Sequence, residues 1–146
     1  MRPVKGVEGK AVLVTAGASG IGYAIAQAFM AAGASVAIVD IDDPALIAAK
    51  GGIPGLAVFK ADMGARESVV AGVKEAAHSV GEIDVLVNNA GIGGPRAAIE
   101  DIEEQDWQRS IDVNLSGAFF AIQAVVPTMK SRGAGVIVNI SSTAQR

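Results

Sequence analysis

The chain of 146 residues contains no cysteine and only one histidine, one tyrosine and one tryptophan. Without cysteine, disulfide scaffolds, thiolate metal sites and cysteine nucleophiles are excluded. His78 stands alone, so a cluster of histidine ligands is excluded as well, and we predict no metal site. Aromatic residues make up only 4% of the chain. This scarcity predicts a core of Ala, Val, Ile and Leu, with helices packed closely on a sheet.

The sequence also lacks an excess of charge and a long hydrophobic run. The net charge is −3, with acidic and basic residues interspersed, so there is no electrostatic footprint for nucleic acid or an anionic membrane. No stretch resembles a signal peptide, and no window approaches the length of a membrane span. We therefore expect a cytoplasmic protein whose partner is a small soluble ligand, with neither nucleic acid nor membrane involved.

What the sequence does contain is a series of short apolar runs. They are continuous rather than alternating, which is typical of strands buried on both faces of a parallel sheet. The runs begin at Ala11, Ser35, Leu56, Val85 and Val136. With a length suited to one core, residues 1–146 are predicted to form a single domain.

Apolar residues between these runs recur at helical spacing. One stripe comprises Ile21, Ile25 and Phe29; a longer one comprises Ile111, Leu115, Phe119, Ile122, Val126 and Met129. We expect both stripes to face the sheet. Asp43 before Pro44 predicts a helix start, and three glycines predict helix ends, namely Gly33, Gly81 and Gly133. Alternating strands and helices predict an α/β fold with a doubly wound parallel sheet of the Rossmann type.

A glycine-rich turn lies between the first strand and the first helix, in "LVTAGASGIGYAIAQAF". Gly17, Gly20 and Gly22 have no side chains there, which would let a pyrophosphate approach backbone N–H groups at the positive end of the helix. Three glycines can also form a plain tight turn. The strand before and the helix after favour nucleotide binding.

Asp40 ends the second apolar run, roughly 20 residues after the glycine turn. A carboxylate there can accept both ribose hydroxyl hydrogens of an adenosine. The alternatives are a solvated strand end or a cap for the next helix, a place better filled by Asp42 or Asp43. The carboxylate would repel a 2′-phosphate, and Ser19 and Ile41 offer no positive charge to bind one. These features favour NAD over NADP.

Several further motifs share one order and spacing with a known family. "TAGASGIG", Ala61–Asp62, "NNAG" at 88–91, "VNLSGAFF" around Asn114 and "VNISS" at 138–142 together resemble the short-chain dehydrogenase/reductase family over nearly the whole chain. A methyltransferase that binds S-adenosylmethionine also uses a glycine turn followed by an acid. The "NNAG" motif and the serine strand argue against that alternative.

The resemblance implies an NAD site whose residues lie in these motifs. Asp62 resembles the acid that bonds the adenine amino group, with Met63 beside it; without the family, Asp62 reads equally well as a turn or cap. Asn88 resembles an asparagine that ties central strands together. The implied cofactor-binding residues are Gly17, Ser19, Gly20, Ile21, Gly22, Asp40, Asp62, Met63, Asn89, Ala90 and Gly91.

Two implied catalytic residues are Asn114 and Ser142. In the family, the matching asparagine holds a water in a kinked helix within the proton relay, and the matching serine bonds the substrate oxygen. From the residues alone, an asparagine in a helix most often faces solvent, and paired serines after a strand are most often loop residues. The resemblance also implies an alcohol or ketone substrate and a homo-oligomer formed through the long helix.

The family's acid/base is a tyrosine, whose pKa is lowered by a lysine four positions later, about a dozen residues after the serine. Tyr23, the one tyrosine present, begins the first helix and cannot play this part. We therefore expect a chain truncated after the fifth strand, inactive by itself, with Val136–Ile140 as an exposed apolar edge. The alternative is a non-catalytic NAD-binding sensor or interaction module.

Two positions depart from the family pattern. Ala16 stands where the family has glycine, so we expect the strained backbone position to fall at Gly17 or the phosphate loop to be remodelled. Gln145 stands where the family often has glycine, three residues after Ser142.

Overall fold

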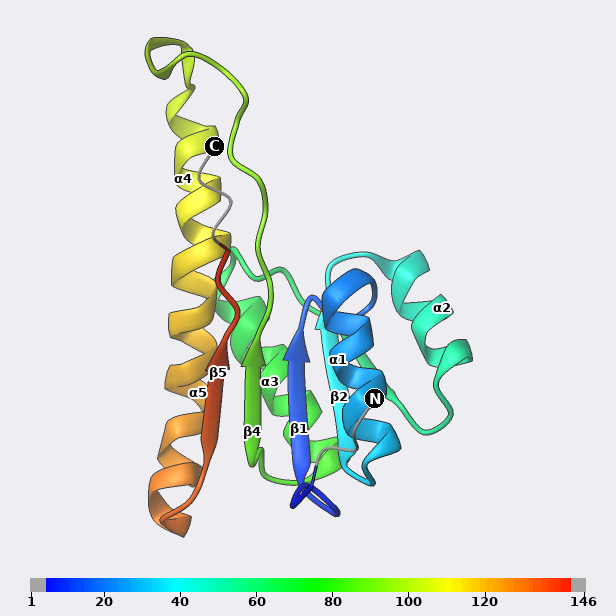
Figure 1. The fold of residues 1–146 in the computed structure, drawn as a ribbon. Coiled ribbons are helices and arrows are strands. Elements are labelled where there is room, and N and C mark those ends of the chain that lie inside the picture. Colours follow the sequence, from blue (N-terminus) through cyan, green and yellow to red (C-terminus); the bar gives the residue numbers. More distant parts are fainter. Residues whose placement is uncertain (1–4, 143–146) are drawn as a thin grey trace.

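The computed structural model describes residues 5–142 and contains a five-stranded parallel sheet with the strand order β3-β2-β1-β4-β5 (Figure 1). The strands are β1 (Ala11–Thr15), β2 (Ser35–Asp40), β3 (Ala57–Lys60), β4 (Val85–Asn88) and β5 (Val136–Asn139). Each begins within a residue of a predicted apolar run. The predicted α/β fold with a doubly wound sheet is confirmed.

Helices cover both faces of this sheet. On one side lie α1 (Gly20–Ala31) and α2 (Asp43–Gly52), and on the other lie α3 (Arg66–Val80) and α5 (Gly117–Arg132). Three shorter elements complete the described chain, namely η1 (Ile99–Asp101), α4 (Glu104–Ile111) and the π-helical turn η2 (Asp112–Ser116).

The core has two halves because neighbouring side chains of a strand point to opposite faces. Val12 and Val14 of β1 pack toward α1 and α2, whereas Leu13 packs toward α3 and α5. Both halves consist of buried apolar side chains, and β1 is buried along its whole length. This two-sided burial explains why the apolar runs are continuous, and the core of Ala, Val, Ile and Leu is confirmed.

Most helix boundaries follow the predicted signals. Gly33, Gly81 and Gly133 all have positive φ and lie at the ends of α1, α3 and α5. Helix α2 begins at Asp43 as predicted, but Asp43 is not its cap. The cap is Asp42, whose side chain accepts a hydrogen bond from the N–H of Ala45, while Asp43 is already helical. A short acceptor at the N-cap satisfies one of the unpaired amides of the first turn.

The predicted apolar stripes were partly wrong. In α1, Ile21 is 67% exposed, although Ile25 and Phe29 pack against the core. In α5, Leu115 just before the helix and Phe119 within it are exposed, at 64% and 55%. Met129 of the predicted stripe is buried, and Ile122 packs against the core. The rest of the buried face is made of Val113, Gly117, Ala121 and Val125. Small residues on that face bring the helix close to the sheet; a Cβ added at Gly117 would lie 2.4 Å from the carbonyl oxygen of Met63.

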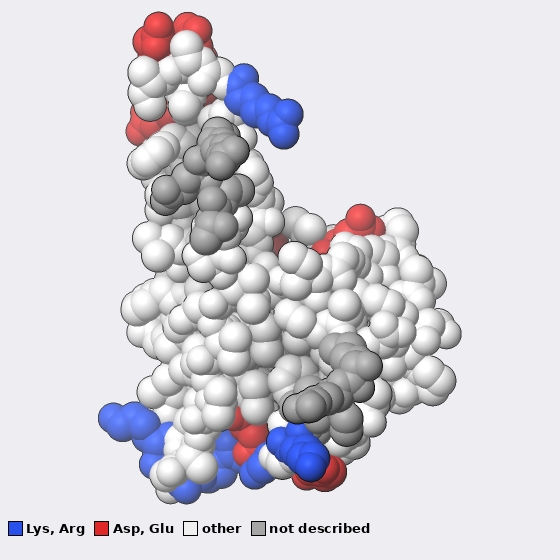
Figure 2. All heavy atoms as spheres, viewed as in Figure 1, with Lys and Arg blue, Asp and Glu red and all other residues white. Residues whose placement is uncertain are grey.

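Elements α4, η2 and α5 form one continuous helix, Glu104–Arg132, which extends past the carboxyl ends of the strands (Figure 1). The first part of this helix and the segment that precedes it form a projection, which we call the arm (residues 92–111). Figure 2 shows acidic side chains at its end, whereas the middle of the same face is mostly uncharged. Contrary to the sequence-based expectation, the helix is long and apolar enough to cross a membrane by length and composition. Core helices of soluble proteins meet the same test, and here α5 packs on α3 and β4.

The last described strand, β5, pairs with β4 and has apolar side chains open to solvent. Val136, Val138 and Ile140 are 54%, 38% and 42% exposed. The predicted exposed apolar strand is therefore confirmed within residues 5–142. Asn88 and Asn139 are neighbours in the two strands, and the Asn88 side-chain amide donates to the Asn139 Oδ1 over 2.9 Å.

Candidate functional site

A cavity of about 200 Å³ lies where the carboxyl ends of β1, β2, β3 and β4 meet the arm. In a doubly wound sheet the strand order reverses between β1 and β4, and ligands bind in the crevice outside the strand ends at such a point. The lining residues are Ala16, Ser19, Asp40, Ile41, Asp62, Met63, Ala90, Gly91, Ile92, Arg109 and Val113.

Six of the predicted cofactor-binding residues line this cavity, namely Ser19, Asp40, Asp62, Met63, Ala90 and Gly91. They come from four separate segments of the chain, which the parallel sheet brings to one edge. The other predicted cofactor-binding residues, namely Gly17, Gly20, Ile21, Gly22 and Asn89, are not among the residues that line it.

Two glycines of the turn make room for close packing rather than for a ligand. A Cβ at Gly17 would lie 2.5 Å from the Ile38 side chain, and one at Gly22 would lie 2.2 Å from the carbonyl oxygen of Ala16. Gly20 differs, since it has a φ of 53° and open space beside it. Ile21 points into solvent. The side chain of the cap residue, Ser19, makes no capping hydrogen bond, so among the described residues the first-turn N–H groups of α1 remain available to an anion.

The strained position of the turn is Ala16, with a φ of 49°. The prediction that it would fall at Gly17 was wrong, because Gly17 is required for its small volume and not for its dihedral angles. Alanine in the left-handed region costs about 1–2 kcal/mol. The surrounding hydrogen bonds hold it there.

Those hydrogen bonds come from the end of β4. The Thr15 hydroxyl oxygen accepts from the backbone N–H groups of Asn89 and Ala90, both at 3.0 Å. The Asn89 side-chain amide donates to the carbonyl oxygens of Thr15 and Ala16, at 3.2 and 3.1 Å. Asn89, predicted to bind the cofactor, thus holds the glycine turn in place through these two hydrogen bonds.

Asp40 is held by backbone amides at the end of β2. Its Oδ2 accepts from the N–H of Ala18 over 3.1 Å, and its Oδ1 accepts from those of Ile41 and Asp42 over 2.8 and 3.2 Å. A carboxylate offers about four acceptor positions, so one position on Oδ2 remains. Asp42, rather than Asp40, caps the next helix, which removes a helix cap as the role of Asp40.

Asp62 lies opposite, after β3, and its carboxylate forms a two-pronged ion pair with Arg109 of α4. The Nη2–Oδ1 distance is 3.0 Å and the Nη1–Oδ2 distance is 3.2 Å. Burial acts to raise the pKa of Asp62, but the hydrogen bond from Arg109, the N–H of Gly64 and the Arg109 charge outweigh it, so the pKa is lowered. The carboxylate is therefore ionised at neutral pH. Asp62 also forms the turn that was its alternative reading, because its Oδ1 accepts from the N–H of Gly64.

Asn114 lies in η2, where the π-helical turn interrupts the regular helix. Its Oδ1 accepts from the N–H of Ile92 over 2.7 Å, and its Nδ2 donates to the carbonyl oxygen of Ile92 over 3.0 Å. The side chain therefore fixes the segment that follows "NNAG" to the helix. π-Helical turns occur often at functional sites, because the extra residue re-aims neighbouring groups.

Ser142 is exposed, three residues after β5, and does not line the cavity. The Tyr23 hydroxyl lies beside α2, 2.4 Å from where a Cβ at Gly52 would be, which agrees with its exclusion as an acid/base. Gln145 lies outside the described residues.

Three residues important to the cavity were not predicted, namely Thr15, Ile92 and Arg109. Thr15 had a usable signal, since a polar side chain ending an otherwise apolar buried run needs a hydrogen-bond partner. Arg109 precedes buried Val113 by one helical turn and so shares its face. No local pattern points to Ile92, which takes part through its backbone.

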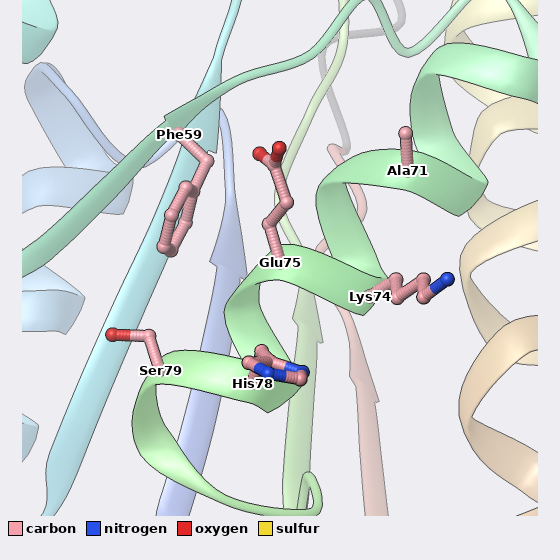
Figure 3. A pocket seen from close by; sticks show the side chains of 6 residues that line it. All are labelled: Phe59, Ala71, Lys74, Glu75, His78 and Ser79. Carbon is pink, nitrogen blue, oxygen red and sulfur yellow. The ribbon is translucent and has the colours of Figure 1, made fainter.

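A larger hollow, of about 620 Å³, lies beside β3 and α3, away from the strand ends (Figure 3). It is lined by Phe59, Ala71, Lys74, Glu75, His78 and Ser79. Its polar groups do not converge, since Lys74 points away from Phe59 around the helix. A ligand site needs a few polar groups aimed at one place, so the smaller cavity is the better candidate despite its size.

The parallel sheet with helices on both faces defines a doubly wound α/β protein of the Rossmann type. Residues 10–146 match the family model described as short chain dehydrogenase. The chain belongs to the short-chain dehydrogenase family.

Curated relatives include the 2-dehydro-3-deoxy-L-rhamnonate dehydrogenase (NAD(+)) of Sphingomonas sp. strain SKA58, which is 37% identical over 93% of this chain and 55% of its own length. D-threitol dehydrogenase of Mycolicibacterium smegmatis is 42% identical over 94% of this chain and 54% of its own length.

Among solved structures, gox2181 is 33% identical, with a TM-score of 0.87 over 92% of this chain and 54% of its own. A structure from Novosphingobium aromaticivorans is 29% identical, with a TM-score of 0.86 over 97% of this chain and 55% of its own. The chain thus spans about half the length of the relatives that it matches.

We predict that Ala16→Gly stabilises the fold, because glycine adopts a φ of 49° without strain. The expected gain is about 0.5–1 kcal/mol in the free energy of unfolding, measured by urea denaturation. Ala24→Gly on the exposed side of α1 is the matched control and should lose up to about 1 kcal/mol. Destabilisation by Ala16→Gly would show that Ala16 is not strained.

Proposed function

We propose that this chain is the NAD-binding part of an oxidoreductase that transfers hydride between NAD(H) and an alcohol or ketone. The observation that carries the proposal is the single cavity shared by the glycine turn, Asp40 and Asp62. The residues fit a dinucleotide. The amino end of α1 offers uncapped N–H groups to a pyrophosphate, and Oδ2 of Asp40 has an acceptor position for a ribose hydroxyl.

Each residue has a role in this proposal. One ribose hydroxyl bonds Oδ2 of Asp40, and the second competes with the amides of Ile41 and Asp42 for Oδ1. Asp62 accepts from the adenine amino group, and Ala90 and Gly91 line the ribose. When bound, the nicotinamide gives or accepts the hydride. Ser142 holds the substrate oxygen, and Asn114 belongs to the proton relay.

The carboxylate of Asp40 should make the site selective for NAD over NADP. Wild-type protein is expected to bind NAD about tenfold or more tightly than NADP in calorimetric titrations, since hydrogen bonds to a charged group contribute about 1.5–3 kcal/mol. In Asp40→Asn, the amide oxygen can still accept from the N–H of Ala18, but the negative charge is gone. The ratio of NAD affinity to NADP affinity should therefore fall.

Asp43→Asn is the matched control, because it removes the same charge at an exposed position paired with Lys60. It should leave the NAD to NADP ratio unchanged. Tighter binding of NADP by the wild type would contradict the role given to Asp40. Binding of S-adenosylmethionine without either dinucleotide would contradict the proposed function as a whole.

A second candidate function is NAD binding without catalysis, as in a sensor. The observation behind it is that Tyr23 lies on α1, beside α2, so residues 5–142 hold no tyrosine in the position of the family's acid/base. Either way, we expect the 146-residue chain to bind NAD and to form no NADH from small alcohols, D-threitol included, in an absorbance assay at 340 nm.

The product of the gene's full reading frame is the comparison in that assay. Activity in the longer product alone supports the dehydrogenase, and inactivity in both supports the sensor. NADH formation by the 146-residue chain would contradict the requirement for an acid/base outside it.

We also propose a homo-oligomer formed through the outer face of α5. Phe119 is exposed there, in a hollow of about 500 Å³ that it shares with Ile122, Gln123, Val126, Pro127 and Lys130. Exposed apolar patches of this kind are common at protein interfaces. Sedimentation velocity should find an oligomer for the wild type and a smaller species for Phe119→Glu, whereas Ile47→Glu on α2, also exposed, should not change the mass. A monomeric wild type would contradict this proposal.

A further inference from the structure

Arg109 is the one basic side chain within residues 5–142 that lines the cavity, and it is committed to a single partner. Both of its terminal nitrogens lie against the carboxylate of Asp62: Nη1 donates to Oδ2 over 3.2 Å, and Nη2 lies 3.0 Å from Oδ1. This geometry is the planar two-pronged arrangement that suits guanidinium and carboxylate, and it fixes the rotation of the carboxylate as well as its place.

The contacts of Asp62 leave a defined gap in its hydrogen bonding. Oδ1 accepts from the N–H of Gly64 over 2.8 Å, and Arg109 Nη2 lies 3.0 Å from it in the ion pair. Oδ2 accepts only from Arg109 Nη1 among the described residues. With two acceptor positions on each oxygen, Oδ1 is faced by two donor groups and Oδ2 by one, so Oδ2 keeps the more open position. The open acceptor of Asp62 therefore has a fixed direction.

The chain also leaves space for this ion pair. A Cβ at Gly64 would lie 2.2 Å from Arg109 Nη1 and 3.2 Å from the Val113 side chain. Gly64 has no positive φ, so its backbone does not need glycine. The missing side chain serves to admit the guanidinium.

The ion pair contributes little to stability. The Arg109 and Asp62 side chains are 44% and 34% exposed, and ion pairs at such positions typically add about 0–1 kcal/mol. The Asp62 carboxylate accepts ordered hydrogen bonds from Arg109 and Gly64, yet the pair adds little stability to the fold, so it is better explained by a role in the cavity that it lines.

We propose that Arg109 is a positioning residue that selects the base of the dinucleotide, an inference that rests on the proposed function. By holding Asp62 with one open acceptor on Oδ2, it favours a base whose edge presents an exocyclic amino group, as adenine does. A base with a carbonyl oxygen at that position places an acceptor against an acceptor. Hypoxanthine, which is otherwise closely similar to adenine, should therefore be discriminated against.

The test compares NAD with nicotinamide hypoxanthine dinucleotide in calorimetric titrations of the wild type and Arg109→Met. Methionine keeps an apolar side chain at this position but cannot hold the carboxylate. NAD affinity should fall up to about tenfold, the value of one ordered hydrogen bond, while affinity for the hypoxanthine analogue stays nearly constant. Loss of the preference for NAD is the supporting result.

Gly64→Ala provides a second variant that retains both charges. Its methyl group would displace the guanidinium, so the preference for NAD should narrow here too. Arg66→Met is the control for net charge, because Arg66 bonds Gln123 and lies over the Phe120 ring on another face. It should behave as the wild type, and thermal melts should confirm that all the variants fold.

The outcomes separate this inference from the function on which it rests. If the wild type binds neither dinucleotide, the proposed function fails. If the wild type prefers NAD and Arg109→Met either keeps the preference or loses both ligands equally, the role of Arg109 is overturned while the proposed function stands.

Discussion

The hydroxyl of Thr15, buried at the end of β1, is the contact on which the candidate site depends. It accepts from two successive amides at the end of β4, and Asn89 returns the connection by donating to the carbonyl oxygens of Thr15 and Ala16. Buried polar groups are costly unless paired, so this small network has one satisfied arrangement. It joins the two strands between which the strand order reverses, and it fixes the carbonyl of the residue with left-handed φ.

With that carbonyl fixed, the rest of the turn depends on the absence of side chains. The Ala16 carbonyl oxygen lies where a Cβ of residue 22 would otherwise be, so glycine at 22 lets α1 begin directly over the strand ends. Gly17 fits against Ile38 in the same way, and Gly117 fits α5 against the Met63 carbonyl. Close packing of this kind explains why the sequence is rich in glycine and alanine but poor in aromatics. The space between the helices and the sheet is small, so large side chains are excluded wherever a helix passes close to the backbone of another segment.

The fold could be predicted from the sequence because its signals are local. Continuous apolar runs marked all five strands, and the glycines marked helix ends. The face of α5 that packs on the sheet could not be predicted, because periodicity shows where apolar residues recur but not which of them point inward. Phe119 and Leu115 are large and apolar, yet Ala121 and Gly117 face inward because they permit a closer approach. In the candidate site, Asp40 and Asp62 could be predicted because each lies at or just after the end of an apolar strand. The pairing of Asp62 with Arg109 spans 47 residues and that of Asn114 with Ile92 spans 22, and neither follows from local pattern.

The charges of the cavity constrain how an anionic cofactor would be held there. Asp40 and Asp62 are both carboxylates, and the charge of Arg109 is already paired with Asp62. Long-range attraction therefore cannot account for binding a pyrophosphate, in a chain whose net charge is itself negative. The available favourable group is the amino end of α1, where unpaired N–H groups and the helix dipole act at short range. Recognition at this site would then depend on fitting the pyrophosphate to the turn that Thr15 and Asn89 hold in place, with the two carboxylates reading the ribose and the base through hydrogen bonds rather than through net charge.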